Sequence, residues 1–147
     1  MITIKKISVN ELPNLVAISY EGDLDLMHKY YHIKLGFQDM INTTLVYIYQ
    51  MASMKKLNHY KVIYNKKPIG YFTTFDNNFL YSFAINKKYR TKDILTKWWA
   101  KVEKELGETF YCGLYECNER AIKFLEKNGM KIIDTDQEYK TVTLVNN

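Results

Sequence analysis

The sequence predicts an α+β fold in which a mixed central sheet of about seven strands is flanked by helices. Three observations support this prediction. The spacing of apolar residues changes from helical to strand-like at His59. Three strand-like stretches then follow one another across short turns, which predicts an antiparallel meander. A strand, a long amphipathic helix and another strand come next, as in a parallel crossover.

The first half of the chain is predicted to hold one strand and three helices. Alternating apolar residues predict a short strand over Ile2–Ile7. Asn10 can cap the helix that follows, and Gly22 closes this helix and opens a second one that ends at Gly36. A clean helical stripe predicts the third helix over Gln38–Met54, and we interpret its apolar side chains as core.

The middle of the chain is predicted to form the meander. Its turns are Asn65-Lys66-Lys67-Pro68 and Asp76-Asn77-Asn78, both rich in residues that favour tight turns. The predicted strands are His59–Asn65, Ile69–Phe75 and Phe79–Ile85.

The last third of the chain is predicted to contain two helices and three strands. Thr91–Leu106 is the most convincing helix, because its apolar residues recur every four positions and Gly107 follows it. Asn118 caps a shorter helix that ends at Asn128-Gly129. The predicted strands are Thr109–Tyr115, Met130–Asp134 and Tyr139–Val145, the last two joined by the turn Thr135-Asp136-Gln137.

The length and composition favour one soluble globular domain over residues 1–147. A chain of 147 residues, 47% hydrophobic and 25% charged, suits a single sizeable core. We find no repeat, low-complexity segment or Pro/Gly-rich linker. The N-terminal MITIKKISVNEL lacks the apolar core of a signal peptide, and no run is long enough to cross a bilayer. We therefore expect a cytoplasmic location and no membrane partner.

The charge favours an anionic partner. The net charge is +5, which favours nucleotides or phosphates. The basic residues are scattered among 16 acids, and this argues against a nucleic-acid partner.

The sequence contains no pattern typical of a metal site or a nucleophile. His28 and His32 lie four apart, but no third ligand is placed with them, and His59 is far along the chain. Cys112 and Cys117 are too few for a disulfide framework and are expected to be reduced thiols.

The basic turn after the meander is the candidate phosphate site. Lysines and Arg90 surround the predicted start of the Thr91–Leu106 helix, where free N–H groups can hold an anion. Asp93 adds a negative charge, and no glycine lets the backbone approach a ligand closely. A solvated loop beside a helix end that Asp93 stabilises explains the same residues equally well.

The order of elements and two local motifs resemble the GNAT acyltransferase superfamily over essentially the whole chain. The family's acyl-CoA loop reads as a strand ending in Val, then x-P-x-Y-R-x-x-G-x-G/A, then a helix. The same frame here is Ile85-Asn86-Lys87-Lys88-Tyr89-Arg90-Thr91-Lys92-Asp93-Ile94-Leu95. It matches at the strand residue, Tyr89 and Arg90, and it has Asp93 and Leu95 at the glycine positions.

The second motif, N-x-x-A-x-x-F-Y-x-x-x-G-F, matches better. It corresponds to Asn118–Met130, with Leu125 at the Tyr position and Met130 at the closing Phe. A weaker similarity lies at Lys67-Pro68-Ile69-Gly70-Tyr71, the common entry into the family's third strand.

The resemblance implies an N-acyltransferase that uses acetyl-CoA or another acyl-CoA. The amine of a small-molecule or protein acceptor would attack the thioester directly. The residues that the resemblance places around acyl-CoA are Phe83, Ile85, Arg90, Thr91, Lys92, Asp93, Ile94, Leu95 and Asn118.

The catalytic groups of the family are harder to place. The usual acid, a Tyr, is Leu125 here, and the strand that often carries a Glu base has no carboxylate. Glu116, Asp76, Tyr81 and Tyr115 are the nearest candidates, and each also suits a structural role. A thiolate can leave unprotonated, so a missing acid would slow such a reaction without forbidding it.

These departures support an alternative, a catalytically inactive GNAT-fold protein that acts as a binding or assembly module. In the family the acceptor site is shaped by the first helices, here about Gly22–Lys56. This region is rich in Tyr, Met and His, which leaves open a partly apolar acceptor pocket or a homodimer contact.

Overall fold

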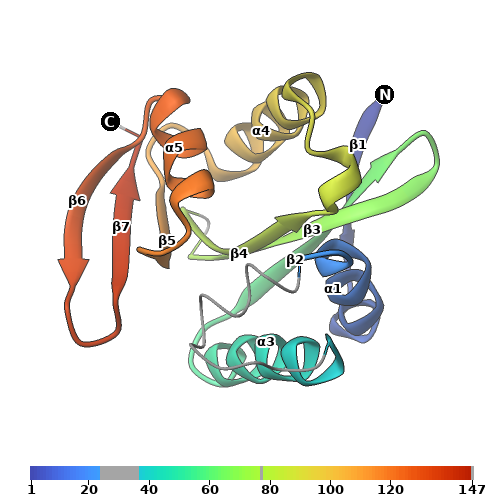
Figure 1. Ribbon diagram of the computed structural model, residues 1–147, viewed down its shortest axis with the longest axis horizontal. Coiled ribbons are helices and arrows are strands. Elements are labelled where there is room, and N and C mark those ends of the chain that lie inside the picture. The colour runs from blue at the N-terminus through green and yellow to red at the C-terminus, as the bar shows by residue number, and fades with distance from the viewer. Residues whose placement is uncertain (24–36, 77, 147) are drawn as a thin grey trace.

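The computed structural model describes residues 1–23, 37–76 and 78–146 and has the expected α+β architecture (Figure 1). The second predicted helix, before Gly36, lies outside these residues. The strands are β1 (Ile2–Ile7), β2 (Leu57–Tyr64), β3 (Lys67–Phe75), β4 (Phe79–Ile85), β5 (Tyr111–Tyr115), β6 (Lys131–Asp136) and β7 (Thr141–Val145). The α-helices are α1 (Leu12–Tyr20), α3 (Phe37–Ala52), α4 (Lys92–Leu106) and α5 (Glu119–Lys127), and the 3₁₀ helices are η1 (Val9–Glu11) and η2 (Lys87–Tyr89).

The seven strands form one mixed sheet in the order β1-β2-β3-β4-β5-β7-β6. The predicted meander is confirmed, because β2, β3 and β4 pair antiparallel in sequence order. The crossover is also confirmed, since β4 and β5 pair in parallel across α4. Their shared register has two pairs, Phe79 with Tyr111 and Leu80 with Cys112. Beyond these pairs the two strands separate, and the sheet is split along its middle.

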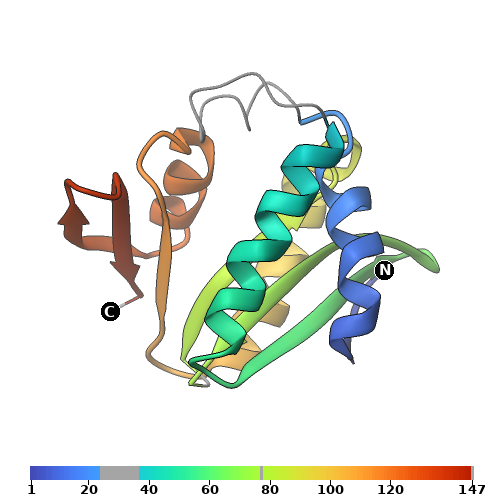
Figure 2. The ribbon, with the colours of Figure 1, turned by 90° about the horizontal axis from the view of Figure 1, so that it is seen from below.

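Helices cover the two faces of the sheet (Figures 1 and 2). On one face α1 and α3 pack over β3 and β4 around a core that includes Leu12, Val16 and Tyr71. On the other face α4 and α5 bury a larger core that includes Trp98 and Trp99. Side chains from both sides of the split join this larger core.

A β-bulge in β4 changes the direction of its side chains. Thr73 pairs with Ser82, but Thr74 pairs with Leu80, so Tyr81 is the extra residue. As a result, Tyr81 and Ser82 both face the α1 and α3 side, whereas Leu80 lies in the core of the opposite face.

Three local predictions were wrong. Asn10 does not cap α1, because the Glu11 N–H donates to the Ser8 carbonyl in a 3₁₀ turn that leads into the helix. The first meander turn has two residues, Asn65 and Lys66, and both have the positive φ of a type I′ hairpin. In the last hairpin β6 continues to Asp136, because its backbone keeps pairing with Thr141. The turn therefore spans residues 137–140.

Candidate functional site

A cavity of about 180 Å³ lies at the split between β4 and β5. It is bordered by the end of α1, the second half of β4, the start of α4 and the start of α5. Its walls are largely apolar, and two arginines, one asparagine and one tyrosine supply its polar side chains. The described residues that line it are Tyr20, Phe83, Ala84, Ile85, Arg90, Leu95, Trp98, Asn118, Arg120, Ala121 and Phe124.

The backbone of β4 presents donors to this cavity. The Asn86 N–H donates to the Ile69 carbonyl of β3 at 2.7 Å. Because backbone groups alternate in direction along a strand, those of Ile85 and Phe83 point away from β3 and toward the split. The Ile85 carbonyl already accepts the Arg90 Nε–H at 2.8 Å. The N–H groups of Phe83 and Ile85 therefore point into the gap between β4 and β5, where the two strands are no longer paired.

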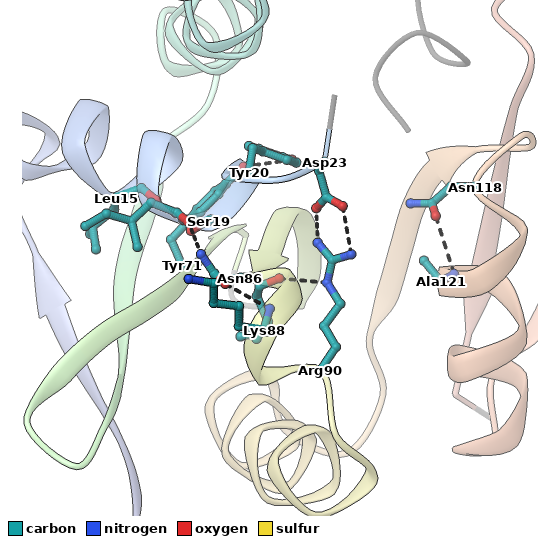
Figure 3. A network of polar contacts seen from close by, with 12 residues as sticks. Leu15, Ser19, Tyr20, Asp23, Tyr71, Asn86, Lys88, Arg90, Asn118 and Ala121 are labelled. Atoms are coloured by element: carbon teal, nitrogen blue, oxygen red, sulfur yellow. Dashed lines mark hydrogen bonds and ion pairs between the residues drawn. The ribbon is translucent and has the colours of Figure 1, made fainter. Parts of the chain in front are cut away.

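Asn86 holds the basic turn in place, and its role was not predicted. It is 5% exposed, and its Nδ2 donates to the Ile18 carbonyl of α1 at 2.7 Å (Figure 3). Its Oδ1 accepts the Lys88 N–H at 2.9 Å, and its carbonyl accepts the Tyr89 N–H. Asn favours such local turns, and that preference was the one available sequence signal. Together these bonds direct the chain from β4 into η2.

Arg90 binds inside the protein rather than facing an open phosphate site. Two of its nitrogens bind the two carboxylate oxygens of Asp23, which follows α1, and its third binds the Ile85 carbonyl (Figure 3). Asp23 is 4% exposed and the Arg90 side chain 19%. The guanidinium charge is therefore largely neutralised. The other cations of the turn, Lys87, Lys88 and Lys92, are exposed.

The start of α4 keeps two backbone donors. Thr91 is the N-cap: its Oγ1 accepts the Ile94 N–H at 3.3 Å and its carbonyl accepts the Leu95 N–H. The first N–H groups of an α-helix have no partner within the helix, so those of Lys92 and Asp93 can bind an anion. The Asp93 carboxylate is 72% exposed and pairs with Lys97 of the next turn at 3.2 Å.

Aromatic rings form one wall of the cavity. Trp98, 1% exposed, lies between Phe83 of β4 and Phe124 of α5, with ring centroids 5.6 and 6.0 Å away. Leu95, one turn before Trp98, also lines the cavity and packs against the same core. This wall can exclude water from a ligand in the split.

Comparison with known proteins identifies the family. The model of the acetyltransferase (GNAT) family matches residues 27–130. The chain belongs to the GNAT acetyltransferase family. A search of curated protein sequences finds no relative of this GNAT protein.

Solved structures of GNAT proteins have the same fold. The PaiA N-acetyltransferase of Thermoplasma acidophilum, solved in complex with coenzyme A, is 18% identical with a TM-score of 0.69, covering 100% of this chain and 99% of its own. A GNAT acetyltransferase of Staphylococcus aureus Mu50 is 18% identical with a TM-score of 0.65, and the match covers 100% of this chain and 99% of that one. The aminoglycoside acetyltransferase AAC(6')-Ib, in complex with coenzyme A, is 15% identical with a TM-score of 0.67, and the match covers 99% of this chain and 94% of that one.

The second GNAT motif begins at the cavity. Asn118 caps α5 by accepting the Ala121 N–H at 3.4 Å, and both residues line the cavity. Arg120 adds an exposed cation beside them. It was not predicted as a site residue, although its position inside the motif was a usable signal. Leu125, at the motif's Tyr position, is 0% exposed in the core.

None of the four predicted catalytic candidates is among the described residues that line the cavity of this GNAT protein. The Tyr81 hydroxyl donates to the Tyr47 carbonyl of α3 at 3.3 Å, and Tyr115 also hydrogen-bonds Tyr47. Burial raises the pKa of Tyr81 and of Tyr115, with nearby tyrosines adding to it. Both phenols therefore stay protonated near neutral pH and are poor bases. Glu116 is exposed, and its backbone N–H donates a hydrogen bond to the Lys140 carbonyl.

Cys112 does not resemble a nucleophile. Neither cysteine forms a disulfide; Cys112 is buried and Cys117 is half-buried. Burial raises the pKa of the Cys112 thiol, which therefore stays protonated in the core.

Within residues 1–23, 37–76 and 78–146, no group of His, Cys, Asp and Glu is arranged to hold a metal ion. His28 and His32 lie outside these ranges. None of the helices described here combines the length and the apolar character needed to cross a membrane.

Proposed function

We propose that this GNAT-family protein is an N-acyltransferase that moves an acetyl or other acyl group from acyl-CoA to an amine. The split between β4 and β5 is the observation that carries the proposal. It combines an apolar cavity, strand N–H groups directed into the opening, and a helix N-terminus beside it. These features suit the pantetheine arm, the thioester carbonyl and the pyrophosphate of acyl-CoA, respectively.

The thioester end of the donor would lie in the split. The N–H groups of Phe83 and Ile85 can hydrogen-bond pantetheine and the thioester oxygen there. A donor aimed at that oxygen binds more strongly once the oxygen becomes an anion, which lowers the barrier to attack. The apolar wall around Trp98 strengthens these bonds because it keeps water away.

The pyrophosphate would lie at the start of α4. The N–H groups of Lys92 and Asp93 can donate to it, and the exposed lysines supply positive charge. The Asp93 carboxylate opposes this binding, but Lys97 offsets part of its charge. Since Arg90 is paired with Asp23, the lysines carry more of the electrostatic attraction than the sequence suggested.

Direct attack is the mechanism that the proposed binding mode favours. The amine lone pair attacks the thioester carbon, the carbon–sulfur bond breaks, and its electron pair leaves with the thiolate. Coenzyme A in the complexes of PaiA and AAC(6')-Ib supports the choice of donor. The acceptor would be a small-molecule or protein amine. A cytoplasmic location and a possible homodimer stay predictions.

The alternative is a GNAT-fold protein that no longer catalyses transfer and acts as a binding or assembly module. Leu95 fills part of the cavity at a position where the family motif has Gly or Ala, and Leu125 cannot donate a proton. These two observations favour the alternative.

Calorimetry with acetyl-CoA separates the two. We expect binding in the micromolar range and tighter binding by Asp93→Gly, which removes the opposing charge and lets the backbone approach. Asp39→Gly, which replaces an acid in the first turn of α3, is the matched control and should not change the affinity. Absence of binding at millimolar acetyl-CoA, with no gain in Asp93→Gly, would overturn the enzyme proposal. If acetyl-CoA binds, a screen of amines for release of free thiol identifies the acceptor.

A further inference from the structure

Tyr20, the last residue of α1, brings an ionisable hydroxyl side chain to the cavity wall. It is 9% exposed, and its ring meets Tyr71 edge to face, with centroids 6.4 Å apart. The other polar side chains on the described wall are two arginines, which stay charged, and the amide of Asn118. Among these lining residues, Tyr20 is therefore the one that can give up a proton and take one back.

The Tyr20 hydroxyl is the first member of a chain of three. It lies 3.4 Å from the Tyr71 hydroxyl, which in turn lies 2.7 Å from Ser82 Oγ. Tyr71 is 0% exposed, and burial raises its pKa, so its hydroxyl keeps its proton. A protonated hydroxyl can accept one proton while it donates another.

The β4 bulge makes this chain possible. Because the bulge places Ser82 on the α1 side of the sheet, its Oγ reaches Tyr71 instead of the opposite core. Ser82 is half-buried. The chain therefore runs from the cavity through a buried phenol to a residue that water can reach.

We propose that Tyr20 is the proton shuttle of the acyl transfer, with Tyr71 and Ser82 as positioning residues. This inference rests on the proposed function. As the carbon–sulfur bond breaks, the Tyr20 O–H gives its proton to the departing sulfur. The phenolate then takes a proton from the new N–H⁺ group, which leaves a neutral amide, a free thiol and Tyr20 in its starting form.

The coupling of the two transfers follows from acidity. A phenol is a weaker acid than an alkanethiol, so the first transfer is favourable when the strongly acidic ammonium returns a proton to Tyr20. Tyr20 would thus take over the role that Leu125 cannot perform. It does so from α1, on the opposite side of the split from α5.

The test is Tyr20→Phe, which keeps the ring and removes the hydroxyl. General acid–base catalysis contributes about 10² to 10⁴ in rate, so we expect kcat with acetyl-CoA to fall about 100-fold while KM for acetyl-CoA stays within about twofold. Tyr71→Phe should lower kcat less, by about fivefold, because it removes a group that positions the Tyr20 hydroxyl but leaves that hydroxyl in place. Tyr139→Phe, at an exposed turn residue, is the matched control and should keep full activity.

A second donor distinguishes proton transfer from structural damage. The thiolate of an acetyl ester of 4-nitrothiophenol leaves without a proton, so the ratio of wild-type to Tyr20→Phe kcat/KM should shrink at least fivefold with it. The comparison of the two ratios does not depend on the amount of folded variant, because an unfolded fraction lowers the variant's rate by the same factor with both donors. Equal ratios with both donors, or full activity of Tyr20→Phe with acetyl-CoA, would overturn the role of Tyr20. Failure of the wild-type protein to transfer acetyl to any amine would instead refute the proposed function.

Discussion

The Arg90 guanidinium binds both carboxylate oxygens of Asp23, a residue 67 positions earlier in the chain. This ion pair fastens the segment after α1 to the turn that enters α4. The same arginine also holds the Ile85 carbonyl at the edge of the cavity. One side chain therefore sets the distance between the α1 side of the site and the proposed acyl-CoA turn.

Asp23→Asn is expected to destabilise the fold by about 3 kcal/mol. Removing one partner of a buried ion pair leaves the other charge without compensation, and losses of this size are typical. Urea denaturation of the two proteins measures the difference in the free energy of unfolding. Asp76→Asn is the matched control, because its pair with Lys55 is exposed and should contribute less than about 1 kcal/mol. Equal losses of unfolding free energy in the two variants would contradict the stabilising role of the buried pair between Arg90 and Asp23.

Gly70→Ala is expected to destabilise the protein by about 1–3 kcal/mol, the range for an overpacked position. A Cβ at Gly70 would clash with the Ala84 carbonyl oxygen and the Ile85 backbone, neither of which can rotate away. To relieve this clash β4 must move, and we expect this movement to weaken acetyl-CoA binding as well. In Gly113→Ala the new Cβ would meet the movable ring of Phe79 at 3.3 Å. Gly113→Ala is the control, and thermal unfolding should place its free energy of unfolding within about 1 kcal/mol of the wild-type value.

Acid is expected to destabilise the protein through His59. Burial lowers the pKa of His59 from its ordinary 6.5, so the folded state holds the ring neutral beside Thr73, 2.9 Å away. Above about pH 7 both states are neutral and the effect is absent. Below pH 6.5 the unfolded chain binds a proton that the folded protein does not, so stability falls by up to about 1.4 kcal/mol per pH unit. Urea titrations from pH 8 to 5 measure this slope, which His59→Gln should flatten. If the slope of unfolding free energy against pH is unchanged in His59→Gln, groups other than His59 cause the acid sensitivity.

Asp93→Asn is expected to tighten acetyl-CoA binding about threefold at low salt. At roughly 6 Å from a phosphate in water, one charge contributes under ~1 kcal/mol. Calorimetry at low and at ~0.5 M salt tests the cause, because screening should remove the gain. A gain that survives high salt would contradict the electrostatic cause, because Asn has the size of Asp and relieves no steric obstruction.

Local sequence patterns were sufficient for most of the fold. Every strand was predicted, because alternation and turn residues are encoded within a few positions. The cap at Asn118 was predicted for the same reason. Asn10 was misassigned because backbone bonding in η1 competes with a side-chain cap, and sequence preferences do not rank the two.

Part of the cavity lining was predictable, namely where one continuous motif supplies it. The acyl-CoA frame and the second motif pointed to Ile85, Leu95 and Asn118, and all three line the cavity. Asn86 and Tyr20 were missed because their roles depend on distant partners, 68 and 51 positions away in the chain. Such pairings arise when the sheet brings α1 against β3 and β4, and no short window of residues carries them.

The two pairs between β4 and β5 also bear on how this protein can change over evolutionary time. The halves of the sheet are joined there mainly by side chains of the shared core, such as Trp98 and Phe124, rather than by a continuous backbone ladder. Side chains can be exchanged one at a time, whereas a backbone ladder must be kept whole. The width of the opening, and with it the range of molecules admitted, can therefore drift by single substitutions while the strands stay as they are.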